Sequence, residues 1–310
     1  MSVYALEAIE DEFCDVSTGM RICYRTYGQR SGEPLLLVAG LGLQLTFWPP
    51  SLINGFVERG YRVVIFDNRD VGRSSRATQP APGLLRQFLR RCSASAYTLQ
   101  DMAKDAIGLL DHLCMSRAHV VGMSMGGMIA QTIAARYPQR TLSLTSIFST
   151  TGARRVGQPA LSSMLMLAKP PPRSREEVMQ RHLKLISHIG STTYPVNKQA
   201  LRAYAAGAWD RGHGAHAHEG TARQIGAIIK SGDRTAEVRR IEAPTLIVHG
   251  DQDRMVAPSG GIATAAAIAG AEMITIRGMG HFIPEAVVPI LSDLIDGHAR
   301  RSSLALMHSL

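Results

Sequence analysis

Long hydrophobic runs are missing from this 310-residue sequence. A helix that crosses a bilayer needs about 20 consecutive, mostly apolar residues, and the longest apolar stretches here, residues 34–43 and 261–271, are much shorter. The first residues, MSVYALEAIEDEF, have neither the basic segment nor the apolar stretch of a secretory signal. We therefore expect a cytoplasmic protein without a transmembrane segment.

Cysteine is also rare, and the four that occur are scattered: Cys14, Cys23, Cys92 and Cys114. No pair has C-x-x-C spacing, and no histidine lies at zinc-finger distance from them, so the sequence predicts neither a metal cluster nor a redox motif. We expect reduced, mostly buried thiols.

Lysine is scarce, with five among the 34 basic residues, so arginine supplies most of the net charge of +9. The arginines occur as scattered pairs, such as Arg90-Arg91 and Arg239-Arg240, without a basic run interleaved with aromatic residues. This pattern argues against a nucleic-acid partner. It favours a surface that attracts anionic substrates or membrane headgroups. With 45% apolar and 19% charged residues, the composition is that of a globular chain able to bury a large core.

Short apolar runs followed by glycine or polar residues predict buried strands that alternate with amphipathic helices. An antiparallel hairpin is predicted over residues 13–27, with Gly19 in its turn. Further strands are predicted at residues 34–39, 61–66, 118–121, 142–148, 245–248 and 273–276. Helices are predicted at residues 98–113, 125–137 and about 285–297, and in the Ala-rich stretch before residue 271. The alternation predicts an α/β fold with a mostly parallel sheet that helices cover on both faces.

The strand rhythm disappears between about residues 152 and 240, where Pro170–Pro172 and a Ser174–Glu177 capping box occur. We therefore predict a core formed by residues 1–152 and 237–310, with a helical cap insertion at residues 153–236. The run Met164–Leu167 fits either core packing or the lining of a pocket. His213, His216 and His218 have a spacing that a metal could use, but a Gly/Ala-rich loop is a poor preorganised site. We expect no metal.

The segment Gly122–Gly126, G-M-S-M-G, follows a predicted strand and opens a predicted helix. In that context G-x-S-x-G is typical of a nucleophile elbow, in which a tight turn leaves little room at the glycines and exposes the serine at the sheet edge. The sequence therefore predicts Ser124 as a nucleophile.

A serine hydroxyl needs a base, and the base needs an acid that orients it. His281 lies in a glycine loop, Gly278–His281, directly after the last predicted strand, and we predict that it is the base. Asp251 and Asp253 both follow the strand at residues 245–248, and the turn of their loop decides which of them faces the histidine.

Acyl transfer also needs N–H donors aimed at the developing oxyanion. Met125 N–H follows the nucleophile, and Leu41 N–H lies in the loop after the first parallel strand, so we predict these two donors. The Gly40 loop lacks the third glycine of a dinucleotide fingerprint. Residues 67–74 are polar and follow a strand, and we expect them to hydrogen-bond their own turn and brace the neighbouring loops rather than to form a second site.

Five motifs, taken together and in this order along the chain, resemble those of the α/β-hydrolase superfamily. They are the Gly40 loop, D-N-R-D-V-G-R-S at residues 67–74, G-M-S-M-G-G, H-G-D-Q-D, and R-G-M-G-H-F-I-P at residues 277–284. Within this superfamily, the chain is similar to the group that contains aclacinomycin methylesterase. The resemblance implies an α/β-hydrolase fold with a mostly parallel eight-stranded sheet and a helical cap. It also implies that the acid is the second aspartate of H-G-x-x-D, which favours Asp253 over Asp251.

We therefore expect a carboxylic ester hydrolase that acts on a small-molecule ester through an acyl-enzyme intermediate, without a cofactor, and that could form a homodimer. An acyltransferase, a C–C bond hydrolase and a perhydrolase fit the same residues, and a non-catalytic ligand-binding protein is the alternative from another class. Epoxide hydrolases and dehalogenases are disfavoured because those relatives have aspartate at the position of Ser124.

Overall fold

A computed structural model describes residues 10–308 of the protein, and within this range eight strands form one sheet in the order β1-β2-β4-β3-β5-β6-β7-β8. The strands are β1 (Glu12–Asp15), β2 (Arg21–Tyr27), β3 (Glu33–Val38), β4 (Tyr61–Phe66), β5 (Ala118–Met123), β6 (Thr141–Ile147), β7 (Thr245–Gly250) and β8 (Glu272–Ile276). The predicted hairpin at β1 and β2 is antiparallel, as is the pairing of β2 with β4, and the remaining pairs are parallel. The predicted mostly parallel sheet is confirmed.

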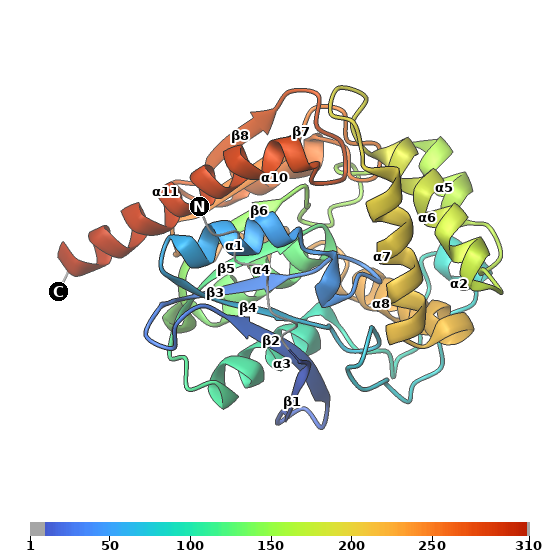
Figure 1. The fold of residues 1–310 in the computed structure, drawn as a ribbon, viewed down its shortest axis with the longest axis horizontal. Helices are drawn as coiled ribbons and strands as arrows, with labels where there is room; N and C mark the ends of the chain where they lie inside the picture. Colours follow the sequence, from blue (N-terminus) through green and yellow to red (C-terminus); the bar gives the residue numbers. More distant parts are fainter. Residues whose placement is uncertain (1–9, 309–310) are drawn as a thin grey trace.

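The sheet has apolar side chains on both faces, and helices cover each face (Figure 1). Along β3, Leu35 and Leu37 pack with α1 (Pro50–Glu58) and α11 (Val288–His308), whereas Leu36 and Val38 pack on the other side. That other side is covered by α3 (Leu99–His112), α4 (Met125–Arg136) and α10 (Ser259–Ala267). Burial on both faces explains why the strands appear as continuous apolar runs in the sequence.

The helix boundaries follow the predictions in most places. The α3 helix begins with a capping box formed by Thr98 and Asp101, and α4 ends before Pro138. The closing helix differs: after a 3-10 turn at η4 (Glu285–Val287), α11 continues past Gly297 as far as His308. Buried Leu291, Ile295 and Ala299 lie on one face of α11, so packing against the core sustains the helix through the glycine.

Helices occupy most of the chain between β6 and β7: α5 (Leu161–Leu167), α6 (Arg175–Ile189), α7 (Lys198–Arg211), α8 (Ala217–Ser231) and the short α9 (Thr235–Val238), with η3 (Gly214–His216) before α8. We call α5 to α8 the cap helices; they gather at one end of the molecule, on the right in Figure 1. Ser174 caps α6 as predicted, but the Glu177 carboxylate accepts from Arg173 N–H rather than from Ser174, so the capping box is incomplete. The remaining short elements are η1 (Leu45–Phe47), α2 (Leu84–Phe88) and η2 (Pro138–Arg140).

Two predictions about burial are wrong. Of the four thiols, which form no disulfide in the part of the chain described, Cys14 and Cys23 are buried, but Cys92 is half-buried and Cys114 is exposed. Core packing of Met164 and Leu165 on α5 is also wrong, because they are 42% and 64% exposed. Between residues 10 and 308, no helix is long and apolar enough to cross a membrane.

Candidate active site

Ser124 lies at the turn that joins β5 to α4, and its backbone has the left-handed conformation (φ 56°, ψ −123°) that a sharp strand-to-helix turn requires. A side chain at Gly122 would overlap the backbone of Gly126, and one at Gly126 would overlap the Val38 carbonyl. The expected lack of space at these glycines is therefore confirmed. The Ser124 N–H donates to the Ile147 carbonyl at 2.9 Å, which fixes the turn against β6.

His281 lies in the loop after β8, with its ring between Ser124 and Asp253. Its Nε2 is 2.9 Å from the Ser124 Oγ, and its Nδ1 is 2.7 Å from the Asp253 Oδ2. Because an ionised carboxylate can only accept, Nδ1 carries the proton toward Asp253, which leaves the neutral ring's Nε2 free to accept from the serine hydroxyl. The ring also packs against Phe148, with 4.5 Å between ring centroids, and the His281 N–H donates to Ile189 at the end of α6.

The two candidate acids have different surroundings. Asp253 is buried, and its Oδ1 accepts from the N–H groups of Met255 and Val256, both at 2.8 Å. Asp251 is exposed, and its Oδ1 accepts from Gly278 N–H, so it holds the loop before His281 without reaching the imidazole. The loop turn thus brings Asp253, and not Asp251, to His281.

Electrostatics keep Asp253 ionised. Burial alone would raise its pKa, but the facing His281, the nearby His249 and the backbone N–H bonds outweigh desolvation and lower the pKa to about 2. His249, at the end of β7, bonds the Val256 carbonyl at 2.9 Å and so supports the Asp253 loop. The carboxylate is therefore ready to stabilise a positive charge on His281.

The two predicted oxyanion donors are not used elsewhere. Within residues 10–308, neither Leu41 N–H nor Met125 N–H donates a hydrogen bond to the protein. Met125 is the first residue of α4, where backbone N–H groups lack helical partners and the helix dipole favours negative charge. A Cβ at Gly40 would lie 3.3 Å from the Ser124 Cβ, so the Leu41 loop runs directly beside the nucleophile.

Gln224 on α8 is a residue of the site that the sequence analysis missed. Its side chain is fully buried; Oε1 accepts from Gly42 N–H at 2.8 Å, and Nε2 donates to the Arg69 carbonyl at 2.9 Å. It thereby joins a cap helix to the loop that carries Leu41. No local motif marks this residue, because its partners lie more than 150 positions away in the sequence.

The segment at residues 67–74 braces its own turn and its neighbours, as predicted. Asp67 accepts from Leu45 N–H and Arg73 N–H, and the Ser74 hydroxyl donates to the Asp67 carbonyl. Its contacts with the cap were not predicted. Asp67 pairs with Arg211 of α7 at 2.6 Å, and Asp70 pairs with Arg223 of α8 at 2.7 Å.

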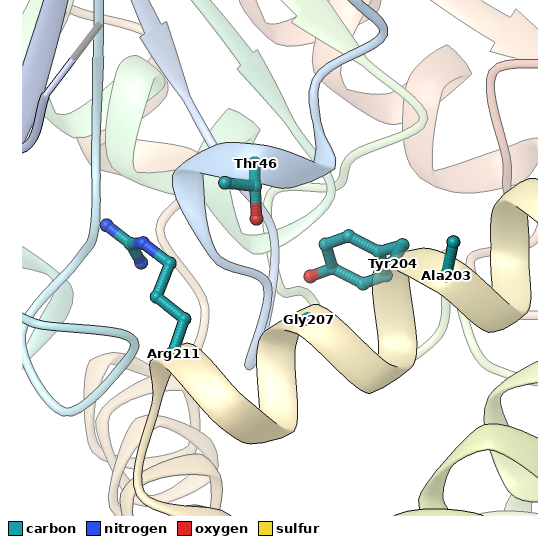
Figure 2. Close-up of a pocket in the computed structure, with 5 residues that line it drawn as sticks. All are labelled: Thr46, Ala203, Tyr204, Gly207 and Arg211. Carbon is teal, nitrogen blue, oxygen red and sulfur yellow. The ribbon is translucent and has the colours of Figure 1, made fainter. Parts of the chain in front are cut away.

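A cavity of about 220 Å³ lies where α7 meets η1 (Figure 2). It is lined by Thr46 of η1 and by Ala203, Tyr204, Gly207 and Arg211 of α7. The Arg211 guanidinium is engaged by Asp67, so its charge is already neutralised. The Phe47 ring packs edge to face against the rings of Tyr204, His182 and Phe282, and Phe282 directly follows His281. None of the five residues that line the cavity belongs to the group of Ser124, His281 and Asp253.

The histidines with possible metal spacing do not converge. His216 Nδ1 faces Glu219 at 3.2 Å, and His218 Nδ1 bonds the Ala215 carbonyl at 2.7 Å. Over the described range, no group of three or more His, Cys, Asp or Glu side chains is arranged to hold a metal ion.

Among curated proteins, the chain is similar to the rhodomycin D methylesterases of Streptomyces peucetius and of another Streptomyces species. The identities are 28% and 29%, and each match covers 89% of this chain and 94% of the relative. A putative carbamate hydrolase of Variovorax paradoxus is 29% identical over 76% of this chain and 80% of its own. The predicted resemblance to the methylesterase group is confirmed.

Among solved structures, the enol-lactonase of Burkholderia xenovorans superposes with a TM-score of 0.71 at 21% identity, over 93% of this chain and 99% of that one. A meta-cleavage product hydrolase from Pseudomonas fluorescens gives 0.74 at 18% identity, over 95% and 98%. These matches show the shared fold. The family model of the alpha/beta hydrolase fold matches residues 33–285, and the chain therefore belongs to the α/β-hydrolase family.

Proposed function

We propose that the protein is a serine-dependent carboxylic ester hydrolase. Support comes first from one observation, the continuous hydrogen-bonded path from the Ser124 Oγ through His281 to Asp253. The methylesterase and carbamate hydrolase relatives support hydrolase activity independently of that geometry. The rhodomycin D methylesterases also make the methyl ester of a carboxylic acid the first substrate class to test.

In the first half-reaction, the Ser124 Oγ attacks the ester carbonyl and its proton passes to His281 Nε2. Asp253 stabilises the imidazolium that forms. The N–H groups of Leu41 and Met125 donate to the oxyanion of the tetrahedral intermediate, and they stabilise it because no protein acceptor competes for them in the described structure. When the intermediate collapses, His281 gives its proton to the departing alcohol oxygen and an acyl-serine remains.

In the second half-reaction, His281 Nε2 accepts a proton from water, whose oxygen attacks the acyl-serine carbonyl. The second tetrahedral intermediate uses the same two N–H donors. Its collapse breaks the bond to the Ser124 Oγ, returns the proton from His281 to that oxygen and releases the carboxylic acid. No step requires a group outside the chain other than the ester and water.

We also propose the division of the chain into a catalytic core, residues 1–152 and 237–310, and a cap, residues 153–236. The core supplies Ser124, Asp253, His281 and both N–H donors. The cap contacts the site through Gln224 and through the Ile189 carbonyl, which accepts from His281 N–H. In this division the cap shapes the substrate pocket while the core performs the chemistry.

Hydrolysis of p-nitrophenyl esters of increasing acyl length, and of methyl esters, tests the proposal. We expect turnover by the wild type and by Ser302→Ala, a matched control in α11 whose hydroxyl, among the described residues, bonds only the His298 carbonyl. We expect Ser124→Ala to remain folded and lose turnover, and a chelator to have no effect. A folded Ser124→Ala variant with the wild-type rate would refute the assignment.

The acyl acceptor is tested in the same assay. If an added alcohol or thiol captures the acyl group much faster than water does, the protein is an acyltransferase and not a hydrolase. Tight ligand binding without turnover of any ester would instead identify a ligand-binding protein that keeps the fold.

A further inference from the structure

The helix α2 and the residue after it expose apolar side chains that a globular surface normally buries. Leu84, Leu85, Phe88 and Leu89 are between 51% and 76% exposed, and no residue of α2 is buried. One exposed leucine is ordinary, but four large apolar side chains within six residues form a patch that calls for a partner.

The helix α5 also exposes large apolar side chains. Leu161, Met164, Leu165 and Leu167 are between 42% and 71% exposed, and only Ser163 of this helix is buried. Figure 1 shows α2 and α5 at the same end of the molecule, that of the cap helices, where α2 packs on α8 and α5 packs on α6. We call these two sets of side chains the apolar end surface.

Along the chain around α2, the charged residues are all basic. The sequence has no aspartate or glutamate between residues 71 and 100, or between residues 112 and 175. Arg86, Arg90 and Arg91 are exposed beside the apolar side chains of α2, and none of them pairs with a carboxylate within residues 10–308. Just after α5, exposed Lys169 and Arg173 are followed by Glu176 and Glu177 in the first turn of α6, so this part of the surface carries both signs of charge. The α2 part of the surface therefore favours a partner that is both apolar and anionic.

We propose that the apolar end surface docks on an anionic lipid bilayer. Leucine, phenylalanine and methionine side chains insert at the boundary between headgroups and acyl chains, while the arginines meet the lipid phosphates. A second copy of this chain fits poorly, because a symmetric contact would bring the unpaired arginines of both copies together. The bilayer supplies the apolar and the anionic component in the same layer.

Docking at this surface would place the candidate active site close to the lipid. The α5 helix is anchored beside the acid, since Ala160 N–H and the Ser163 hydroxyl both donate to the carbonyl of Arg254, the residue after Asp253. The α2 helix packs on α8, which carries Gln224. An apolar ester dissolved in the bilayer would then reach the protein without crossing water. The binding itself does not depend on the proposed hydrolase activity.

Co-sedimentation of the full chain with vesicles tests the proposal, using phosphatidylcholine alone or mixed in equal parts with phosphatidylglycerol. We expect the wild type to bind the mixed vesicles and to be released by salt, which screens the arginines. Phe88→Ser together with Leu165→Ser should weaken binding more than about tenfold, because two apolar insertions are lost. Ile290→Ser, at an exposed apolar site on α11, is the control and should bind like the wild type.

The charge contribution is tested separately. Arg90→Gln with Arg91→Gln should weaken binding to mixed vesicles about fivefold per arginine. The same change at Arg239 and Arg240, exposed residues just after α9, should have much less effect.

Three outcomes would overturn the proposal: no binding of the wild type to mixed vesicles, equal losses in test and control variants, or a wild-type dimer that Phe88→Ser dissociates, which would identify a second copy as the partner. Unchanged turnover of a short, water-soluble ester in the α2 and α5 variants would show that they are folded.

Discussion

Replacing Gln224 by leucine removes the side chain that ties α8 to the proposed oxyanion loop, residues 40–43. Leucine has a similar volume, so the packing of α8 is largely kept while both hydrogen bonds are lost. Gly42 N–H and the Arg69 carbonyl then have no partner in a site where Gln224 is fully buried. The variant therefore isolates the polar contribution of this residue.

The expected loss of stability and of kcat follows from these two backbone groups. Each buried polar group left without a partner costs about 1–3 kcal/mol, so the free energy of unfolding should fall by roughly 2–6 kcal/mol unless the loop moves to reach water. Loop movement displaces Leu41 N–H, and complete loss of one oxyanion donor lowers kcat by about 10²- to 10³-fold. Because the donor is displaced rather than deleted, we expect kcat to fall about ten- to a hundredfold, with little change in KM.

The assay is kcat and KM for a short p-nitrophenyl ester, measured well below the unfolding midpoint of each variant. Arg223→Met is the matched control. Arg223 lies on the same helix as Gln224, and its replacement breaks the ion pair with Asp70 without touching Gly42. Equal losses of kcat in the two variants would mean that Gln224 only holds the cap. An unchanged kcat in Gln224→Leu would refute the role of the oxyanion loop.

Three further changes test other contacts. Asp253→Asn keeps the shape of the site but loses the charge that faces His281, so kcat at saturating ester should fall about 10⁴-fold. Gly126→Ala should abolish folding, as seen by circular dichroism, because its Cβ overlaps the Val38 carbonyl, whereas Gly207→Ala in α7 meets no atom within 4 Å and should stabilise by up to about 1 kcal/mol. Burial lowers the pKa of His182 to about 4 in the folded protein, so on acidification the His182 ring is protonated at a higher pH in the unfolded chain than in the folded one. Stability should therefore drop between pH 6.5 and 4 by up to about 3 kcal/mol, and denaturant titrations should show a smaller drop in His182→Phe.

Local patterns were sufficient to predict the strands and the positions of the candidate site residues. Strands buried on both faces are continuous apolar runs, and Ser124 follows such a strand directly, whereas Asp253 and His281 lie in the loops after β7 and β8. Parallel strands end at one edge of the sheet, so Ser124 after β5, Asp253 after β7 and His281 after β8 are brought to the same place by the topology alone. The choice between Asp251 and Asp253 required the family resemblance, because it depends on how one loop turns.

Contacts between distant segments could not be predicted in this way. The pairs Arg211 with Asp67 and Arg223 with Asp70 join residues 144 and 153 positions apart, and nothing in the local sequence of a helix distinguishes an arginine that faces the core from one that faces water. The expectation that Leu165 packs in a core failed for a related reason. A Leu- and Met-rich helix is normally buried, and only its position at the end of the cap leaves it uncovered.

The cap helices are thus held to the rest of the protein by directional polar contacts as well as by packing. Apolar contacts tolerate sliding, whereas a buried ion pair or a buried amide with both partners fixed is satisfied in one register only. Asp67 and Asp70 hold α7 and α8 through Arg211 and Arg223, and Gln224 extends the same register to the loop of Leu41. These contacts fix α7 and α8, whereas α5 is held separately, through the Arg254 carbonyl beside Asp253, so the two parts of the cap are tied to different sides of the candidate site.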